Sequence, residues 1–273
     1  MKIPTKKEAE TIFGPDVDQT VPLVFQAVAT SPSEENNAIE LHFQIGCDFS
    51  LGYRGVAVID LISHLAYNSA YNQLRTKEQL GYIVSAFAKK STGGSWGLSI
   101  VVQSSVVSPL TLEERALAWV DQFRTEIESM SAETIASEAG AVVAQLLERD
   151  TKLSQEVNRM WGEILATLSS PAALRTPVFD RLSKLADELM ATDLTEAEQL
   201  KKDLLAMFDQ HLAKTAPERR VISARVYNQD GADEFETNKD KPGILSSYED
   251  IRAFKQYQST WPLAPYSARN LDW

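Results

Sequence analysis

Arg75 and Tyr82 are the residues of this sequence whose chemistry is most distinctive, and they flank the stretch TKEQLG. A guanidinium and a phenol are both hydrogen-bond donors that do not bind metal ions. If both point into one cleft, they can bind a peptide carbonyl and stabilise the negative charge that forms when water attacks it. A purely structural explanation also exists. Arginine near a helix C-terminus binds loose carbonyl groups, tyrosine is common in strands, and spacing alone favours this explanation.

Residues that could bind a metal or act as nucleophiles are few and scattered. The three histidines, His42, His64 and His211, lie in the contexts HFQIG, HLAYN and HLAKT. None of these fits H-E-x-x-H or H-x-x-E-H, which place two imidazoles on one helix face beside a catalytic glutamate. The one cysteine, Cys47, has no partner, and no G-x-S-x-G motif occurs. We therefore expect no catalytic zinc site built from this chain alone.

Composition narrows the possible partners and compartment. The chain has 273 residues and a net charge of −11, which argues against nucleic acid or an anionic membrane as the main partner. No apolar run is long enough to span a bilayer, and the N-terminus lacks the apolar core of a secretory signal. A single cysteine suits a reducing compartment. We expect a cytoplasmic protein, without excluding an organelle.

The elements that must position Arg75 and Tyr82 are a helix and a strand. Helical spacing from Val58 to Ser69 predicts a helix that follows breaks at three glycines and ends near Leu74. Residues 82–88 read as a strand, the glycine-rich segment 91–97 as a turn, and LSIVVQS as the second strand of a hairpin. Before them, residues 21–29 alternate weakly, and NAIELHFQI alternates cleanly as a half-buried strand.

Consecutive helices are predicted after residue 110. Thr111 with Glu114, and Thr195 with Glu198, match the capping-box pattern at two helix starts. Apolar stripes with helical spacing run through residues 116–130, 135–146, 153–168, 178–189 and 197–207. After these helices, a further strand is predicted in the segment RRVISARVYN.

This order of elements predicts an α+β fold with a mostly antiparallel sheet and helices packed on one face. No Pro/Gly/Ser-rich linker divides the chain. We therefore expect a lead-in over residues 1–20, an α+β domain over 21–228, and an acidic segment with an aromatic tail of the same domain over 229–273.

Beyond these patterns, LRTKEQLGYIV (residues 74–84) resembles the signature of the C-terminal domain of insulin-degrading enzyme and its pitrilysin relatives, the inverted zinc metallopeptidases. GLSIVVQSS, KLSQEVNRMWGEI, TAPERRVISARV and the tail DIRAFKQYQSTWPLAP follow in the family's order. The resemblance runs from about Val21 to the end. It implies the fourth of four homologous metallopeptidase/processing-peptidase-like domains that close around an unfolded peptide.

The resemblance also implies roles for individual residues. Zinc and H-x-x-E-H lie in the family's first domain, so the zinc-bearing N-terminal half and a peptide substrate are the implied partners. The last domain contributes an arginine and a tyrosine that contact the substrate backbone, and these match Arg75 and Tyr82. The aromatic residue that lines the pocket after the scissile bond matches Tyr71, where the best-known members have phenylalanine.

One segment departs from the family pattern. Animal members have a lysine-rich run before KLS that helps to bind polyanions such as ATP. Here that run is LLERDTKLS, in which only Arg149 and Lys152 are basic and Glu148 and Asp150 flank them. Polyanion activation through this domain is therefore not expected.

Two functions remain open. The first is a domain without zinc, inactive alone, that contacts substrate in a zinc endopeptidase degrading short or unfolded peptides. The second is a non-catalytic scaffold or interaction domain of the same fold. The intact LRTKEQLGY favours the first, because a scaffold has no need of two inward-pointing donors.

Overall fold

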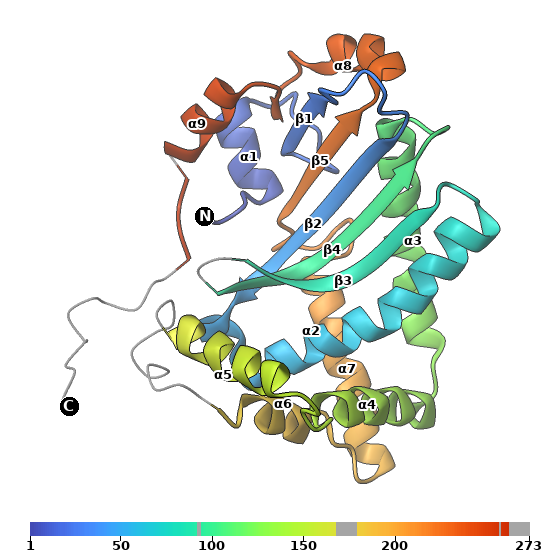
Figure 1. The fold of residues 1–273 in the computed structure, drawn as a ribbon, viewed down its shortest axis with the longest axis vertical. Helices are drawn as coiled ribbons and strands as arrows, with labels where there is room; N and C mark the ends of the chain where they lie inside the picture. Colours follow the sequence, from blue (N-terminus) through green and yellow to red (C-terminus); the bar gives the residue numbers. More distant parts are fainter. Residues whose placement is uncertain (92–93, 168–178, 257, 262–273) are drawn as a thin grey trace, which may run out of the picture.

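One sheet organises the chain. The computed structural model describes residues 1–91, 94–167, 179–256 and 258–261 (Figure 1). Within them, six strands lie in the order β3-β4-β2-β5-β1-β6. Their bounds are β1 Val24–Val28, β2 Asn37–Cys47, β3 Ile83–Ser91, β4 Ser95–Ser104, β5 Val221–Tyr227 and β6 Ile244–Leu245. The pairs from β3 to β5 are antiparallel, as predicted, whereas β1 pairs in parallel with both β5 and β6.

The helices lie between and after these strands. The α-helices are α1 Lys6–Phe13, α2 Asp48–Ala70, α3 Pro109–Ser129, α4 Ala132–Leu146, α5 Leu153–Thr167, α6 Arg181–Leu189, α7 Leu194–His211, α8 Ala232–Asn238 and α9 Tyr248–Gln256. A π-helix, η1 Tyr71–Lys77, continues α2, and a short 3₁₀-helix, η3, covers Gln229–Gly231. None of the helices in the described ranges is long and apolar enough to cross a bilayer.

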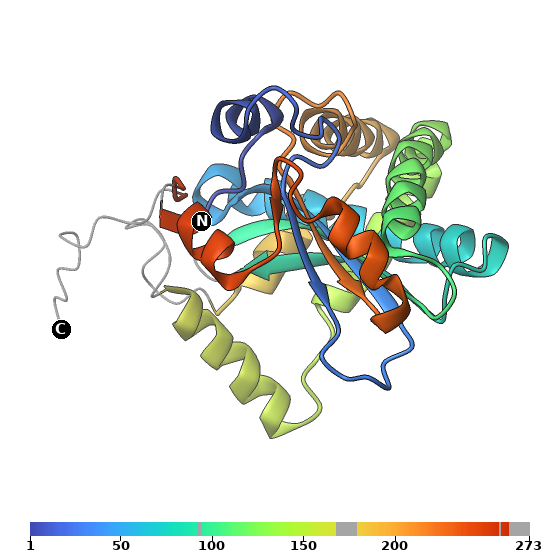
Figure 2. The ribbon, with the colours of Figure 1, turned by 90° about the horizontal axis from the view of Figure 1, so that it is seen from above.

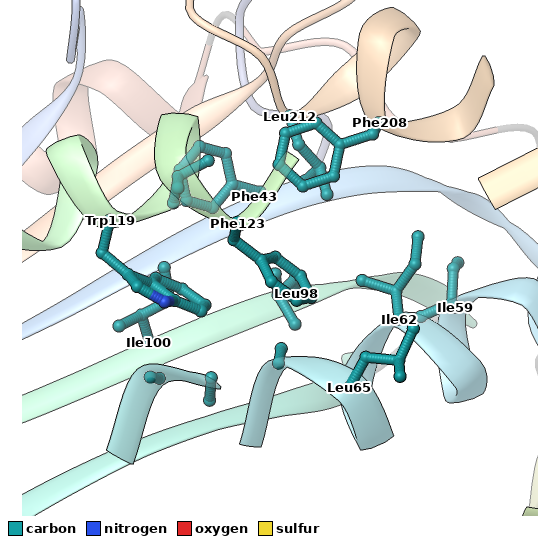
Figure 3. Close-up of a cluster of buried hydrophobic side chains, with 14 of the residues drawn as sticks. Phe43, Ile59, Ile62, Leu65, Leu98, Ile100, Trp119, Phe123, Phe208 and Leu212 are labelled. Carbon is teal, nitrogen blue, oxygen red and sulfur yellow. The ribbon is translucent and has the colours of Figure 1, made fainter. Parts of the chain in front are cut away.

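The main core lies between the sheet and the helices on one face of it. Helix α2 packs on β3 and β4, α3 packs on β2 and β5, and α7 packs on β2. Figure 3 shows Trp119 and Phe123 from α3 over Leu98 and Ile100 from β4. The α3 rings stack at 5.1 Å between centroids, and burial of such side chains contributes about 1.5–3 kcal/mol each. The α+β fold with helices packed on one face is therefore confirmed.

The described segments before β1 and after β5 form further elements and a second apolar cluster. The segment expected as a polar lead-in contains α1, and the acidic segment after residue 228 contains η3, α8, β6 and α9. Ile3, Leu23, Leu245 and Phe254 form a second, smaller apolar cluster there. Helix α5 lies apart from α3 and α7 in the view from above (Figure 2). Leu168, Val178 and the tail from Pro262, which the sequence patterns include, lie outside the described residues.

The predicted helix starts are wrong in three places. Ser108 rather than Thr111 caps α3: its side chain accepts a hydrogen bond from the Thr111 N–H at 3.5 Å, and proline follows it at the first helical position. Asp193 rather than Thr195 caps α7, with a bond of 2.9 Å to the backbone N–H three residues later. Helix α2 begins after Gly46 but before Gly52 and Gly55, and Gly52 (φ 60°) kinks it instead of preceding it.

A polar network lies on β2, β3 and β4. Lys89 Nζ and Ser99 Oγ both donate to Glu40 Oε1, at 2.5 and 2.9 Å. Ser99 Oγ lies 2.9 Å from His42 Nδ1. Because the serine proton goes to Glu40, His42 Nδ1 must be the donor in its bond to Ser99. His42 Nε2 is buried without a partner, and burial lowers the pKa of His42 to about 4.

This buried histidine predicts a pH dependence of stability. Between about pH 4 and 6.5 the unfolded chain binds a proton at His42 that the folded chain does not. The free energy of unfolding therefore rises with pH in this window. Between pH 7 and 4, the residue should account for a loss on the order of 3 kcal/mol. Urea titrations at several pH values should show a shallower slope for His42→Asn than for the wild type. Equal slopes would contradict the assignment.

Candidate functional site

The candidate site is built where α2 passes into β3. Helix α2 continues as the π-helix η1, a distortion found frequently at functional sites. Leu74 and Leu80 are buried on either side of the turn that follows. The Leu80 N–H donates to the Leu74 carbonyl at 3.0 Å, which closes the turn. Tyr82 comes one residue before β3, so the strand begins at Ile83 rather than at Tyr82 as predicted.

The turn requires glycine because it packs directly against β4. A Cβ atom at Gly81 would lie 1.8 Å from the Gln103 carbonyl oxygen, far inside van der Waals contact. Gln79 also has a positive φ of 55°, a conformation uncommon for a non-glycine residue. The turn is therefore held against the sheet, and Tyr82 leaves it in a fixed direction.

Arg75 lies between two tyrosine rings. Its guanidinium carbon is 4.7 Å from the centroid of Tyr71 and 4.7 Å from that of Tyr82. Such contacts orient a cation through the ring quadrupole. The structure thus brings the three predicted site residues together into one cluster, which we call the Tyr–Arg–Tyr cluster.

This cluster faces solvent. Tyr82 is 81% exposed and Tyr71 is 38% exposed. Within the described part of the chain, the Arg75 guanidinium forms neither an ion pair nor a hydrogen bond, so its donors are available to a ligand. A large exposed aromatic residue beside a cation without a counter-ion is a surface suited to binding.

Glu78, which the sequence analysis did not select, fixes the turn to α3. Its two carboxylate oxygens accept hydrogen bonds from Arg115 Nε and Nη2 at 2.7 and 2.9 Å. Gln73 Nε2 donates to it at 2.8 Å. These bonds, with Arg115 the main cause, lower the pKa of Glu78. Glu78 was visible inside the quoted motif, but its partner on α3 is revealed only by the tertiary structure.

The histidines do not form a zinc site. His42 lies on β2 and bonds Ser99, whereas His64 on α2 forms a pair with Glu138 at 3.0 Å. In the described ranges, no group of three His, Cys, Asp or Glu side chains is placed to hold a metal ion. The residues that the structure describes therefore do not supply the ligand set of a catalytic zinc.

The chain is similar to known peptidases in both sequence and fold. The family described as "PQQ synthase PqqF-like, C-terminal lobe domain 4" matches residues 61–161, which include the whole candidate site. The chain is 29% identical to the "Nardilysin-like" protein of Arabidopsis thaliana over 241 residues, which cover 88% of this chain and 22% of that protein. It is 31% identical to the insulin-degrading enzyme of Homo sapiens over 172 residues, which cover 62% of this chain and 15% of that enzyme.

Among solved structures, that of pitrilysin has the same fold. The TM-score is 0.60 at 21% identity, over 90% of this chain and 23% of that one. The chain thus spans about a fifth of the length of the relatives it matches most extensively. The family match, the relatives and the fold all agree: the chain is similar to insulin-degrading enzyme, nardilysin and pitrilysin, and the matched family model describes a fourth domain of a C-terminal lobe.

Proposed function

We propose that this chain is the domain of a zinc metalloendopeptidase that holds no zinc and contacts the backbone of a short or unfolded peptide substrate. The observation that carries the proposal is the Tyr–Arg–Tyr cluster: a half-buried cation that has no counter-ion among the described residues, set between two exposed rings, at the position of the family motif. The partner that we propose is the zinc-bearing N-terminal half of such an enzyme. A cytoplasmic location remains part of the proposal.

Each residue of the cluster has a distinct role. Arg75 donates hydrogen bonds to a substrate carbonyl and keeps the scissile bond in place, already in the ground state. The Tyr82 hydroxyl donates to the oxygen that becomes negative as the carbonyl is attacked. Tyr71 offers its ring to the side chain after the scissile bond. Zinc, when bound by another domain, supplies the activated water.

The alternative is a scaffold domain that keeps the fold and binds only partner proteins. It would account for the fold and the apolar core equally well. It gives no reason for an arginine that is oriented by two aromatic rings yet lacks a carboxylate partner in the described chain. That feature favours the catalytic proposal.

The kinetics of the full-length enzyme test the roles of Tyr82 and Arg75. Tyr82→Phe should lower kcat by roughly 10²–10³ with little change in KM, because an oxyanion contact exists mainly in the transition state. Arg75→Ala should damage both constants, since its carbonyl contact exists in the ground state as well. Tyr248→Phe, which removes the hydroxyl of a tyrosine that is 73% exposed on α9, is the matched control and should leave both unchanged. Wild-type kinetics for both site variants would favour the scaffold.

Glu78 is a positioning residue in this proposal. It touches no substrate, but its bonds to Arg115 and Gln73 hold the turn that separates Arg75 from Tyr82. Removing the carboxylate charge should therefore loosen the cluster without removing any donor to the substrate.

A double-mutant cycle tests this role. We expect Glu78→Gln and Arg115→Met each to lower kcat by about 10-fold, and the double variant to be no worse than either single one, because both break the same contact. Arg124→Met is the matched control: it breaks another exposed arginine–carboxylate pair of α3, with Asp209 at 2.6 Å, and should leave kcat unchanged. Additive losses in kcat for the cycle would show that the two residues do not act together.

A further inference from the structure

A pocket lies beside α2, on the N-terminal side of the Tyr–Arg–Tyr cluster. It is a half-open pocket with a volume of about 590 Å³, lined by residues of α2, α4, α6 and β3, the edge strand of the sheet. Its walls combine apolar side chains with a few polar ones. The residues that matter to its chemistry are Asp60, His64, Tyr67, Leu146 and Leu182.

Asp60 is the group of this cavity whose charge is not compensated. Within the described residues, it forms neither a hydrogen bond nor an ion pair. Burial raises the pKa of Asp60 to about 6, and the charge of Arg181 opposes this only in part. Arg181 itself donates to Asp48 at 3.0 Å, so its guanidinium is already bound elsewhere. A carboxylate in this position would be stabilised by a cation entering the cavity.

The histidine of the pocket wall is already paired. His64 Nε2 lies 3.0 Å from Glu138 of α4. The cavity therefore presents a net negative charge to a ligand, which favours a cation over an anion. Its apolar residues suit the aliphatic part of a long basic side chain.

The cavity and the cluster lie on one helical face. Tyr67 lines the cavity, is 53% exposed, and precedes Tyr71 by one helical turn. From Asp60 to Arg75 the chain advances fifteen residues, or about 22 Å at 1.5 Å per residue. An extended peptide covers that distance in roughly seven residues.

We propose that this cavity is a subsite for a lysine or arginine side chain of the peptide substrate, roughly seven residues from the carbonyl bound by Arg75. Asp60 would pair with the charged end, and Tyr67 and the leucines would cover the stem. This inference rests on the proposed function, because it takes the peptide backbone to lie along α2. It assigns to the domain a preference for basic substrates that the Tyr–Arg–Tyr cluster alone would not give.

Peptide binding to this chain tests the proposal. Fluorescein-labelled peptides of about fourteen residues would carry one lysine, moved along the sequence, or norleucine at the same position. By anisotropy, wild-type protein should bind the lysine peptide roughly 10-fold more tightly at one position, as expected for a charge-assisted pair. Asp60→Asn should abolish the difference, whereas Glu198→Gln, which removes an exposed carboxylate on α7, should preserve it.

Two further variants keep the test decisive. Tyr67→Ala changes an exposed residue, so it should fold and should reduce the preference for lysine even if Asp60→Asn does not fold. Arg75→Ala should weaken all peptides equally. If Arg75→Ala has no effect while the lysine preference persists and depends on Asp60, the proposed function fails and the cavity assignment stands. A lysine preference that survives in Asp60→Asn, or no preference at any position in the wild type, would overturn the subsite.

Discussion

The packing of α2 on β3 and β4 is the constraint on which the candidate site depends. Its apolar face, which includes Ile59, Ile62 and Leu65, is buried against the sheet. Tyr67 and Tyr71 lie outside this buried face and are exposed. Because the helix cannot rotate without exposing its core residues, the orientation of the site follows from the hydrophobic effect.

The end of this helix adds a second constraint. Gly81 brings the turn against the carbonyl of Gln103, at a distance that no side chain permits. The π-helical turn before it adjusts the direction of Arg75, and Glu78 connects the turn to α3. The rigid parts are thus buried or paired, while the groups free to bind a ligand lie on the outside. This is the division expected of a site whose donors must be held in place before the substrate arrives.

The charge of the chain is consistent with such a role. An excess of carboxylates attracts basic ligands, and Asp60 directs part of that excess into a cavity beside the site. The acidic surface would also discourage polyanion binding, in keeping with the absence of a lysine-rich run before Leu153. The described part of the chain provides donors and, in Asp60, one half-buried carboxylate without a hydrogen-bond or ion-pair partner, and the proposed function assigns the zinc chemistry to another domain.

The sequence by itself determined the α+β class and most of the strands and helices. It also singled out Tyr71, Arg75 and Tyr82 as candidate site residues. Periodicity sufficed for the elements because burial of one face imposes it on each helix and strand locally. The family motif, and not the spacing, selected the site residues.

Only the tertiary structure decided the rest. Ser108 and Asp193 replaced the predicted caps because several side chains near a helix start can accept the same N–H, and the final backbone path selects among them. The parallel pairing of β1 with β5 and β6 joins segments far apart in the chain. Contacts such as Glu78 with Arg115, the stacking of Arg75 between two rings, and the unpaired carboxylate of Asp60 depend on distances between elements, and local sequence patterns do not encode these distances.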